Sequence, residues 1–90
     1  MDVISSMIYE TSFRGTVARE VERYCKGTAK CWLDKDNDRF VVSIIDPRNR
    51  VWNYEEYDLS NKLYNGISSN QIAHNAVIAY QKKVFREFFK

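Results

Sequence analysis

Few side chains in this sequence are able to do acid–base or nucleophilic chemistry. His74 is the only histidine, and Cys25 and Cys31 are the only cysteines. A nucleophile or a general base needs a partner group within hydrogen-bond reach, and the spacing of these three residues indicates no such pairing. A single histidine also excludes a metal site built on a histidine pair. We therefore predict no catalytic residue, no metal and no cofactor, and interpret His74 as an ordinary histidine at a helix edge.

An acidic run in the first half of the chain has part of the pattern of a calcium site. Asp34, Asp36 and Asp38 have the spacing of the first three ligands of a calcium-binding loop. Arg39 stands where such a loop needs a glycine, and Ile45 where it needs a glutamate. The run therefore favours a solvated hairpin turn over a metal site.

Glu55, Glu56 and Asp58 form a second acidic cluster. Paired carboxylates perform general acid–base catalysis when they face the same substrate. Neighbouring residues of a strand point to opposite faces, so Glu55 and Glu56 cannot act together. We interpret the cluster as charge that keeps a sheet edge soluble, and predict that the protein is not an enzyme.

Residues 30–57 are predicted to form three antiparallel strands that organise the chain. Residues 39–45 (RFVVSII) are rich in β-branched and aromatic side chains, which is typical of a central strand. Residues 34–38 (DKDND) and 46–49 (DPRN) flank it with turn-forming side chains. Counting through two simple hairpins gives a core face of Ala29, Cys31, Leu33, Phe40, Val42, Ile44 and Val51. A bulge of one residue would exchange part of this assignment.

The opposite face of this sheet is the predicted interaction surface. By the same count it carries Lys30, Trp32, Val41, Ser43, Ile45, Arg50, Trp52 and Tyr54. The candidate contacts are Trp32, Trp52, Tyr54, Arg50 and Lys30. Trp, Tyr and Arg dominate protein binding hot spots, and aromatic rings beside cations also bind nucleic acids. The alternative is that the N-terminal residues or the last helix cover this face, which would make the aromatics part of the core.

An amphipathic helix is predicted before the sheet. Its apolar stripe consists of Phe13, Val17, Val21 and Tyr24. Ser12 or Thr16 is expected to cap its start, and Gly27 to end it in the left-handed conformation. Residues 1–12 fit a helical extension, an extended arm or a strand.

The longest predicted helix follows Ser68, which forms a capping box with Gln71. Its buried stripe is predicted to be Ile72, Ala73, Ala76, Val77, Tyr80, Val84 and Phe88. Phe85, Phe88 and Phe89 widen the apolar surface at its end, which makes this end a candidate site of self-association. If the partner is a nucleic acid, the candidate contacts on this helix are Lys82, Lys83, Arg86 and Lys90.

The order helix, three strands, helix over residues 13–90 resembles that of the double-stranded-RNA-binding domain. That family is expected to have a lysine-rich start to its second helix and a Gly-Pro-x-His element between its first strands. Here the last helix begins with residues 68–71 (SSNQ), and the turn of residues 34–38 is acidic. Both recognition elements are absent and the turn would repel a phosphate backbone, so the chain is not assigned to that family.

The length and composition of the sequence indicate which class of protein it belongs to. Ninety residues with 44% hydrophobic side chains and a net charge of +2 are typical of one globular domain that folds unaided. The sequence has no apolar run long enough to cross a bilayer and no signal-peptide pattern. Two cysteines favour reduced thiols in the cytoplasm. We predict a single α+β domain over residues 1–90, a non-enzymatic cytoplasmic module. Its expected partner is an unidentified protein or a second copy in a homodimer, with nucleic acid as the alternative and neither membrane nor small molecule as a ligand.

Overall fold

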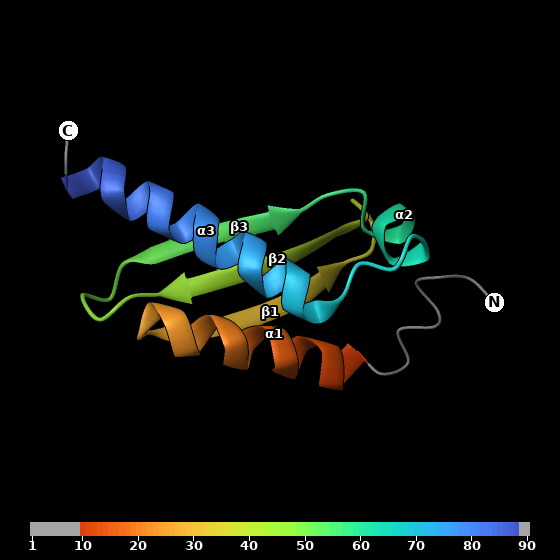
Figure 1. Ribbon diagram of the computed structural model, residues 1–90, viewed down its shortest axis with the longest axis horizontal. Coiled ribbons are helices and arrows are strands. Elements are labelled where there is room, and N and C mark those ends of the chain that lie inside the picture. Colours follow the sequence, from red (N-terminus) through yellow and green to blue (C-terminus); the bar gives the residue numbers. More distant parts are fainter. Residues whose placement is uncertain (1–9, 89–90) are drawn as a thin grey trace.

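The computed structural model of the chain describes residues 10–88 and, among their side chains, those of residues 12–87. The elements are α1 (Glu10–Cys25), β1 (Thr28–Asp34), β2 (Arg39–Ile45), β3 (Val51–Glu56), α2 (Leu59–Tyr64) and α3 (Ser69–Phe88). A helix, a three-stranded antiparallel sheet and a long last helix confirm the predicted α+β class and element order (Figure 1). Of residues 1–12, for which a helical extension, an extended arm or a strand was predicted, residues 10–12 belong to α1 and residues 1–9 lie outside the described residues.

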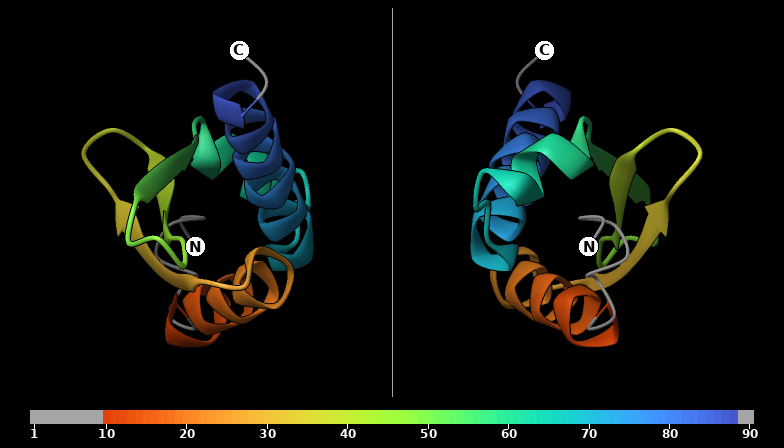
Figure 2. Two further views of the ribbon diagram at one scale, coloured as in Figure 1. Left: turned by 90° about the vertical axis from the view of Figure 1, so that its left-hand side faces the viewer. Right: turned by 90° about the vertical axis from the view of Figure 1, so that its right-hand side faces the viewer.

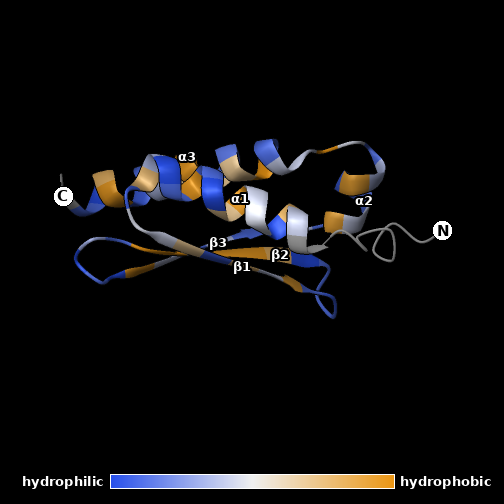
Figure 3. Ribbon diagram, turned by 90° about the horizontal axis from the view of Figure 1, so that it is seen from below, coloured by the Kyte–Doolittle hydropathy of each residue, from blue (hydrophilic) through white to orange (hydrophobic). Residues whose placement is uncertain are grey.

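The fold has two layers, with α1 and α3 on the same face of the sheet. Seen end-on, the sheet lies on one side and both helices lie on the other (Figure 2). We call the face under the helices the covered face, and the opposite one, over which Figure 3 shows no described element, the outer face. α1 packs against β1, β2 and α3, and α3 packs against β3. The fully buried side chains between the layers are Val17, Val21, Phe40, Val42, Ile44, Leu59, Ile72 and Ala76.

The β1–β2 hairpin has the predicted register. Cys31 faces Val42 and Leu33 faces Phe40, so these side chains share the covered face. The chain reverses through residues 35–38, where Asp38 adopts a positive φ of 49° and its N–H donates to the carbonyl of Lys35. Asp tolerates this left-handed conformation, so a polar turn of even length joins the two strands without a bulge.

The β2–β3 hairpin differs from the predicted register by one residue. Ile44 faces Trp52 rather than Val51, and Val42 faces Tyr54. A β-turn is closed by the Asn49 N–H, which donates to the Asp46 carbonyl at 2.9 Å. Asn49 then adopts a φ of 64°, and the Asp46 N–H donates to the carbonyl of Arg50. Asn49 is thus one extra residue in a left-handed position, the bulge that commonly follows such a turn, and it reverses the faces of β3.

The ends of α1 also differ from the prediction. Ser12 and Thr16 lie inside the helix, so neither caps it. Lys26, with a φ of 55°, takes the left-handed position that was expected for Gly27. Gly27 is required for a different reason, because a Cβ there would lie 2.1 Å from the carbonyl oxygen of Ile45.

The start of α3 confirms the Ser68 half of the predicted capping box, whereas the Gln71 side chain donates to Asn75 at 3.0 Å. The Oγ of Ser68 accepts a hydrogen bond from the N–H of Gln71 at 3.2 Å. Ile72 is fully buried in the next turn, where it joins the core. Among residues 10–88, no helix has the length and apolar character needed to cross a membrane.

Candidate functional site

The predicted aromatic surface is divided between the two faces of the sheet. Trp32 lies on the outer face, where 43% of it is exposed, and Lys30 lies on that face with it. Trp52 and Tyr54 lie on the covered face, half-buried against the core. The prediction that Trp32, Trp52, Tyr54 and Arg50 share one surface with Lys30 is therefore wrong, because the extra residue at the β2–β3 turn moves the β3 side chains to the other side.

Trp52 is an internal anchor between the β2–β3 turn and α3. Its indole Nε1 donates to the Oδ2 of Asp46 at 3.0 Å. The Arg50 guanidinium lies 5.2 Å from the centre of its ring, and the Tyr80 ring meets it edge to face with centroids 6.0 Å apart. Its apolar ring packs on the core and its polar atom is satisfied, which is how a buried tryptophan is usually accommodated.

The Asp46 carboxylate holds the same turn together and is 5% exposed. It accepts hydrogen bonds from the backbone N–H groups of Arg48 and Arg50 and from the Arg50 Nε, each at 2.9 Å. Burial would raise the pKa of this carboxyl, but its hydrogen bonds with Arg50 and Trp52 outweigh that effect and lower the pKa to about 2. Asp46 is therefore ionised in the fold and acts as a structural acceptor.

Glu56 is a second buried carboxylate, 5% exposed, and joins three elements. It accepts hydrogen bonds from the Tyr54 hydroxyl at 2.8 Å, from Lys62 Nζ of α2 at 2.6 Å and from Asn75 Nδ2 of α3 at 2.9 Å. Burial opposes its charge, but these donors together hold the pKa of the carboxyl below its usual range. The prediction that Glu56 solubilises a sheet edge is therefore wrong, since β3 turns it inward.

Two carboxylates of the acidic turn, Asp34 and Asp38, form ion pairs or hydrogen bonds within the fold. Asp34 pairs with the Nε of Arg39 at 2.7 Å, and the same guanidinium pairs with Glu55. Asp38 accepts hydrogen bonds from the backbone N–H of Ser60 at 3.0 Å and from its hydroxyl at 2.6 Å, so the turn fixes the start of α2. Within residues 10–88, no group of three or more His, Cys, Asp or Glu side chains is arranged to hold a metal ion.

Side chains of the two helices form hydrogen bonds with backbone groups on both edge strands of the sheet. On β1, the N–H of Ala29 donates to the Glu22 carboxylate of α1 at 2.9 Å. On β3, the carbonyl of Asn53 accepts a hydrogen bond from Lys83 of α3 at 2.8 Å. Charged side chains at sheet edges oppose pairing with a further strand, so these positions do not favour recognition by strand addition.

Both cysteines are free, as predicted from their number and spacing. Cys25 is buried in the core, and Cys31 is half-buried on the covered face. Burial raises the pKa of the Cys25 thiol to about 11 and that of the Cys31 thiol to about 12. A thiol with such a pKa is protonated near neutral pH and is a poor nucleophile.

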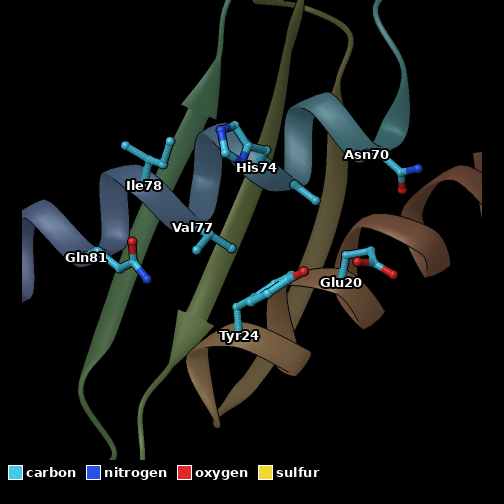
Figure 4. A pocket seen from close by; sticks show the side chains of 8 residues that line it. Glu20, Tyr24, Asn70, His74, Val77, Ile78 and Gln81 are labelled. Atoms are coloured by element: carbon cyan, nitrogen blue, oxygen red, sulfur yellow. The ribbon is translucent and has the colours of Figure 1, made fainter.

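A groove lies between α1 and α3, on the side of the helices turned away from the sheet (Figure 4). Its volume is about 540 Å³. It is lined by Glu20 and Tyr24 of α1 and by Asn70, Ala73, His74, Val77, Ile78 and Gln81 of α3. Tyr24 is 61% exposed here rather than part of the buried stripe of α1. His74 thus lines a concave surface, which its position at a helix edge did not reveal.

The hollow surface continues along α3 towards its C-terminal end. A second depression of about 370 Å³ shares Ile78 and Gln81 with the groove and adds Lys82, Phe85 and Arg86. Phe85 is 62% exposed and Ile78 is 37% exposed. The groove and this continuation together form what we call the helical groove.

The exposed residues of α3 that line the helical groove follow a regular pattern. His74, Ile78, Gln81 and Phe85 are spaced by four, three and four residues. This is the spacing of the seam along which two helices of a coiled coil meet. The seam was missed in the sequence because two of its four residues are polar and because a more apolar stripe on the same helix forms the core.

The remaining candidate residues of α3 divide into two groups. Phe85, Lys82 and Arg86 line the helical groove, whereas Lys83 points to the β3 edge and contacts Asn53. Phe89, Lys90 and the side chain of Phe88 lie outside the described residues.

Comparison with models of known protein families, with curated proteins and with solved structures finds no match for this chain. Its function is therefore argued from its own geometry. Among residues 12–87, exposed large apolar side chains include Trp32 and Val51 on the outer face, Tyr64 on α2, and Tyr24, Ile78 and Phe85 at the helical groove. The outer face and the helical groove are the two surfaces considered for binding.

Proposed function

We propose that the protein is a non-enzymatic binding module that holds an amphipathic helix of a partner protein in the helical groove. The observation that carries this proposal is the exposed seam on α3, which has coiled-coil spacing and runs beside Tyr24 of α1. Grooves of this kind bind the apolar side of a helix through residues one turn apart. A partner helix laid along the seam would add a third layer, over α1 and α3 on the side away from the sheet.

Three large apolar side chains give the groove its binding energy in this proposal. Tyr24, Ile78 and Phe85 are all exposed and lie on both sides of the groove and along its continuation. Fully burying an exposed apolar side chain contributes roughly 1.5–3 kcal/mol, and binding gains the part that is still exposed, which is larger for Phe85 than for Ile78. Since about 1.4 kcal/mol is a tenfold change in affinity, removing any one of them has a measurable effect.

The outer face of the sheet is the weaker candidate. It presents one indole where the sequence predicted two indoles and a tyrosine. The charged side chains at one end of this face already form ion pairs, because Arg39 pairs with both Asp34 and Glu55. The surface that remains around Trp32 lacks Trp52 and Tyr54, the other aromatic side chains of the predicted interaction surface.

Nucleic-acid binding is the second candidate, and the position of the cations favours it. The C-terminal half of α3 and the β2–β3 turn lie at the same end of the molecule (Figure 1), which brings Lys82 and Arg86 to the end that also carries Arg48. Two contacts oppose nucleic-acid binding. Lys83 donates a hydrogen bond to the carbonyl of Asn53, and Trp52 packs against Tyr80 rather than being free to stack on bases. A steep fall of affinity with salt would identify this mode of binding.

A display library of helical peptides tests the proposed function. The library has apolar residues fixed at coiled-coil seam positions and all other positions varied, and selection is on the intact protein. Clones are expected to bind, and to lose at least tenfold in affinity with Ile78→Glu or Phe85→Glu. Trp32→Glu, on the outer face, is the matched control and should leave binding unchanged.

Three results would contradict the proposal. One is that no peptide binds. A second is that binding survives both groove variants and is lost with Trp32→Glu. The third is that an oligonucleotide binds through Lys82 and Arg86 in a salt-dependent manner while no helical peptide does.

A further inference from the structure

We infer that the occupant of the helical groove is an acidic amphipathic helix, with carboxylates on the side that faces away from α1 and towards Lys82 and Arg86. This inference rests on the proposed function and adds the chemical class of the partner. It follows from the unequal charge of the two walls of the groove.

The side of the seam that faces away from α1, which we call the outer wall, is positively charged. Lys82 and Arg86 are exposed, lie four residues apart and therefore stand one above the other on α3. Both line the depression that contains Phe85. Because an α-helix turns by about 100° per residue, Lys82 and Arg86 lie on the same side of the seam. Glu87 projects to the opposite side of the helix.

The inner wall, formed by α1, carries little net charge. Its acidic residue is Glu20, and Arg23 lies 3.6 Å from that carboxylate. Among the described lining residues, the charged side chains are therefore one carboxylate with a nearby cation where α1 borders the groove, and two cations in the continuation around Phe85 that α3 alone lines. A helix with acidic side chains against Lys82 and Arg86 fits this asymmetry, and a basic one is repelled from the Phe85 end.

The size of the effect follows from the exposure of these cations. An exposed ion pair stabilises a contact by a small amount and is screened by salt. Two such pairs change affinity by about two- to thirtyfold. Charge therefore selects among helices that the apolar seam already binds, and it does not replace the seam.

The test uses three versions of one peptide clone selected on the intact protein. They carry Glu, Gln or Lys at the two flank positions that face Lys82 and Arg86, and their affinities are measured by fluorescence anisotropy at low and high salt. The Glu version is expected to bind tightest and the Lys version weakest, with the differences shrinking at high salt. The double variant Lys82→Glu/Arg86→Glu is expected to reverse the order.

A control separates this inference from the proposed function. Lys30→Glu/Lys35→Glu changes the net charge equally at exposed positions outside the groove and should preserve the original order. Equal affinities of the three peptides for the unmodified protein, or an order that the double variant does not change, would overturn the inference. If the Gln peptide also binds the Ile78→Glu variant of the protein with undiminished affinity, the proposed function itself is contradicted.

Discussion

Helix α3 has two apolar sides that differ in what they contact. The side facing the sheet places Ile72 and Ala76 in the core, where neither is exposed to solvent. The other side places Ile78 and Phe85 in the helical groove, where both are exposed. Both sides carry apolar residues at helical spacing, but the groove side also contains the polar residues His74 and Gln81. Periodicity therefore predicts the more apolar stripe, whereas the positions of the sheet and α1 decide which side of the helix is buried in the fold and which stays exposed.

The first prediction concerns the core side of α3 and has the largest effect. Replacing Ile72 by Ala is expected to lower the free energy of unfolding by about 2–5 kcal/mol, because it leaves a cavity between the layers. Ile78→Ala, in the groove, is expected to change it by less than about 1 kcal/mol. Urea denaturation measures both. Equal losses for the two variants would contradict the assignment of the two sides.

The second prediction concerns the polar contact between α3 and β3. Glu56→Ala removes the acceptor that Asn75, Lys62 and Tyr54 share, and should lower the free energy of unfolding by about 3 kcal/mol. Glu55→Ala, in the neighbouring position on the outer face, is the matched control and is expected to cost less than half as much. Similar losses would show that the buried network does not join α3 to the sheet as described.

The third prediction concerns pH and the anchor of Trp52 against α3. Because the folded state lowers the pKa of Asp46 from 3.8 to about 2, its ionised form stabilises the fold above pH 3.8. That contribution is expected to disappear as the pH falls from about 4 to about 2. The melting temperatures of the unmodified protein and of Asp46→Asn should therefore differ at pH 6 and converge towards pH 2. A constant difference between them would rule out this role.

The fourth prediction concerns the groove side and has the smallest effect on stability. Phe85→Glu should leave the free energy of unfolding within about 0.5 kcal/mol of the unmodified value, since the ring is 62% exposed. Its effect is expected in peptide binding instead. A large loss of stability would mean that Phe85 belongs to the core and not to a docking surface.

Local signals in the sequence predicted the elements well. The Ser68 cap of α3 and the β1–β2 register depend on side chains within a few residues of each other, and both are present in the structure. The class and order of the elements followed from hydrophobic periodicity, which these strands and helices obey.

The candidate site depended on details that the sequence does not settle. The left-handed conformation of Asn49 shifts the register by one residue and carries Trp52 from the outer face to the covered face. Asp38 and Glu56 resemble surface charges in the sequence but bind partners elsewhere in the fold. The helical groove arises only when α1 and α3, separated by the whole sheet in the chain, pack side by side.

The most direct test of the central claim is the affinity of one selected helical peptide for Ile78→Glu and for Trp32→Glu, measured in parallel with the melting temperature of each. The helical groove predicts at least a tenfold loss for Ile78→Glu and none for Trp32→Glu, with both proteins folded. A loss confined to Trp32→Glu would place the docking surface on the outer face of the sheet and contradict the proposal.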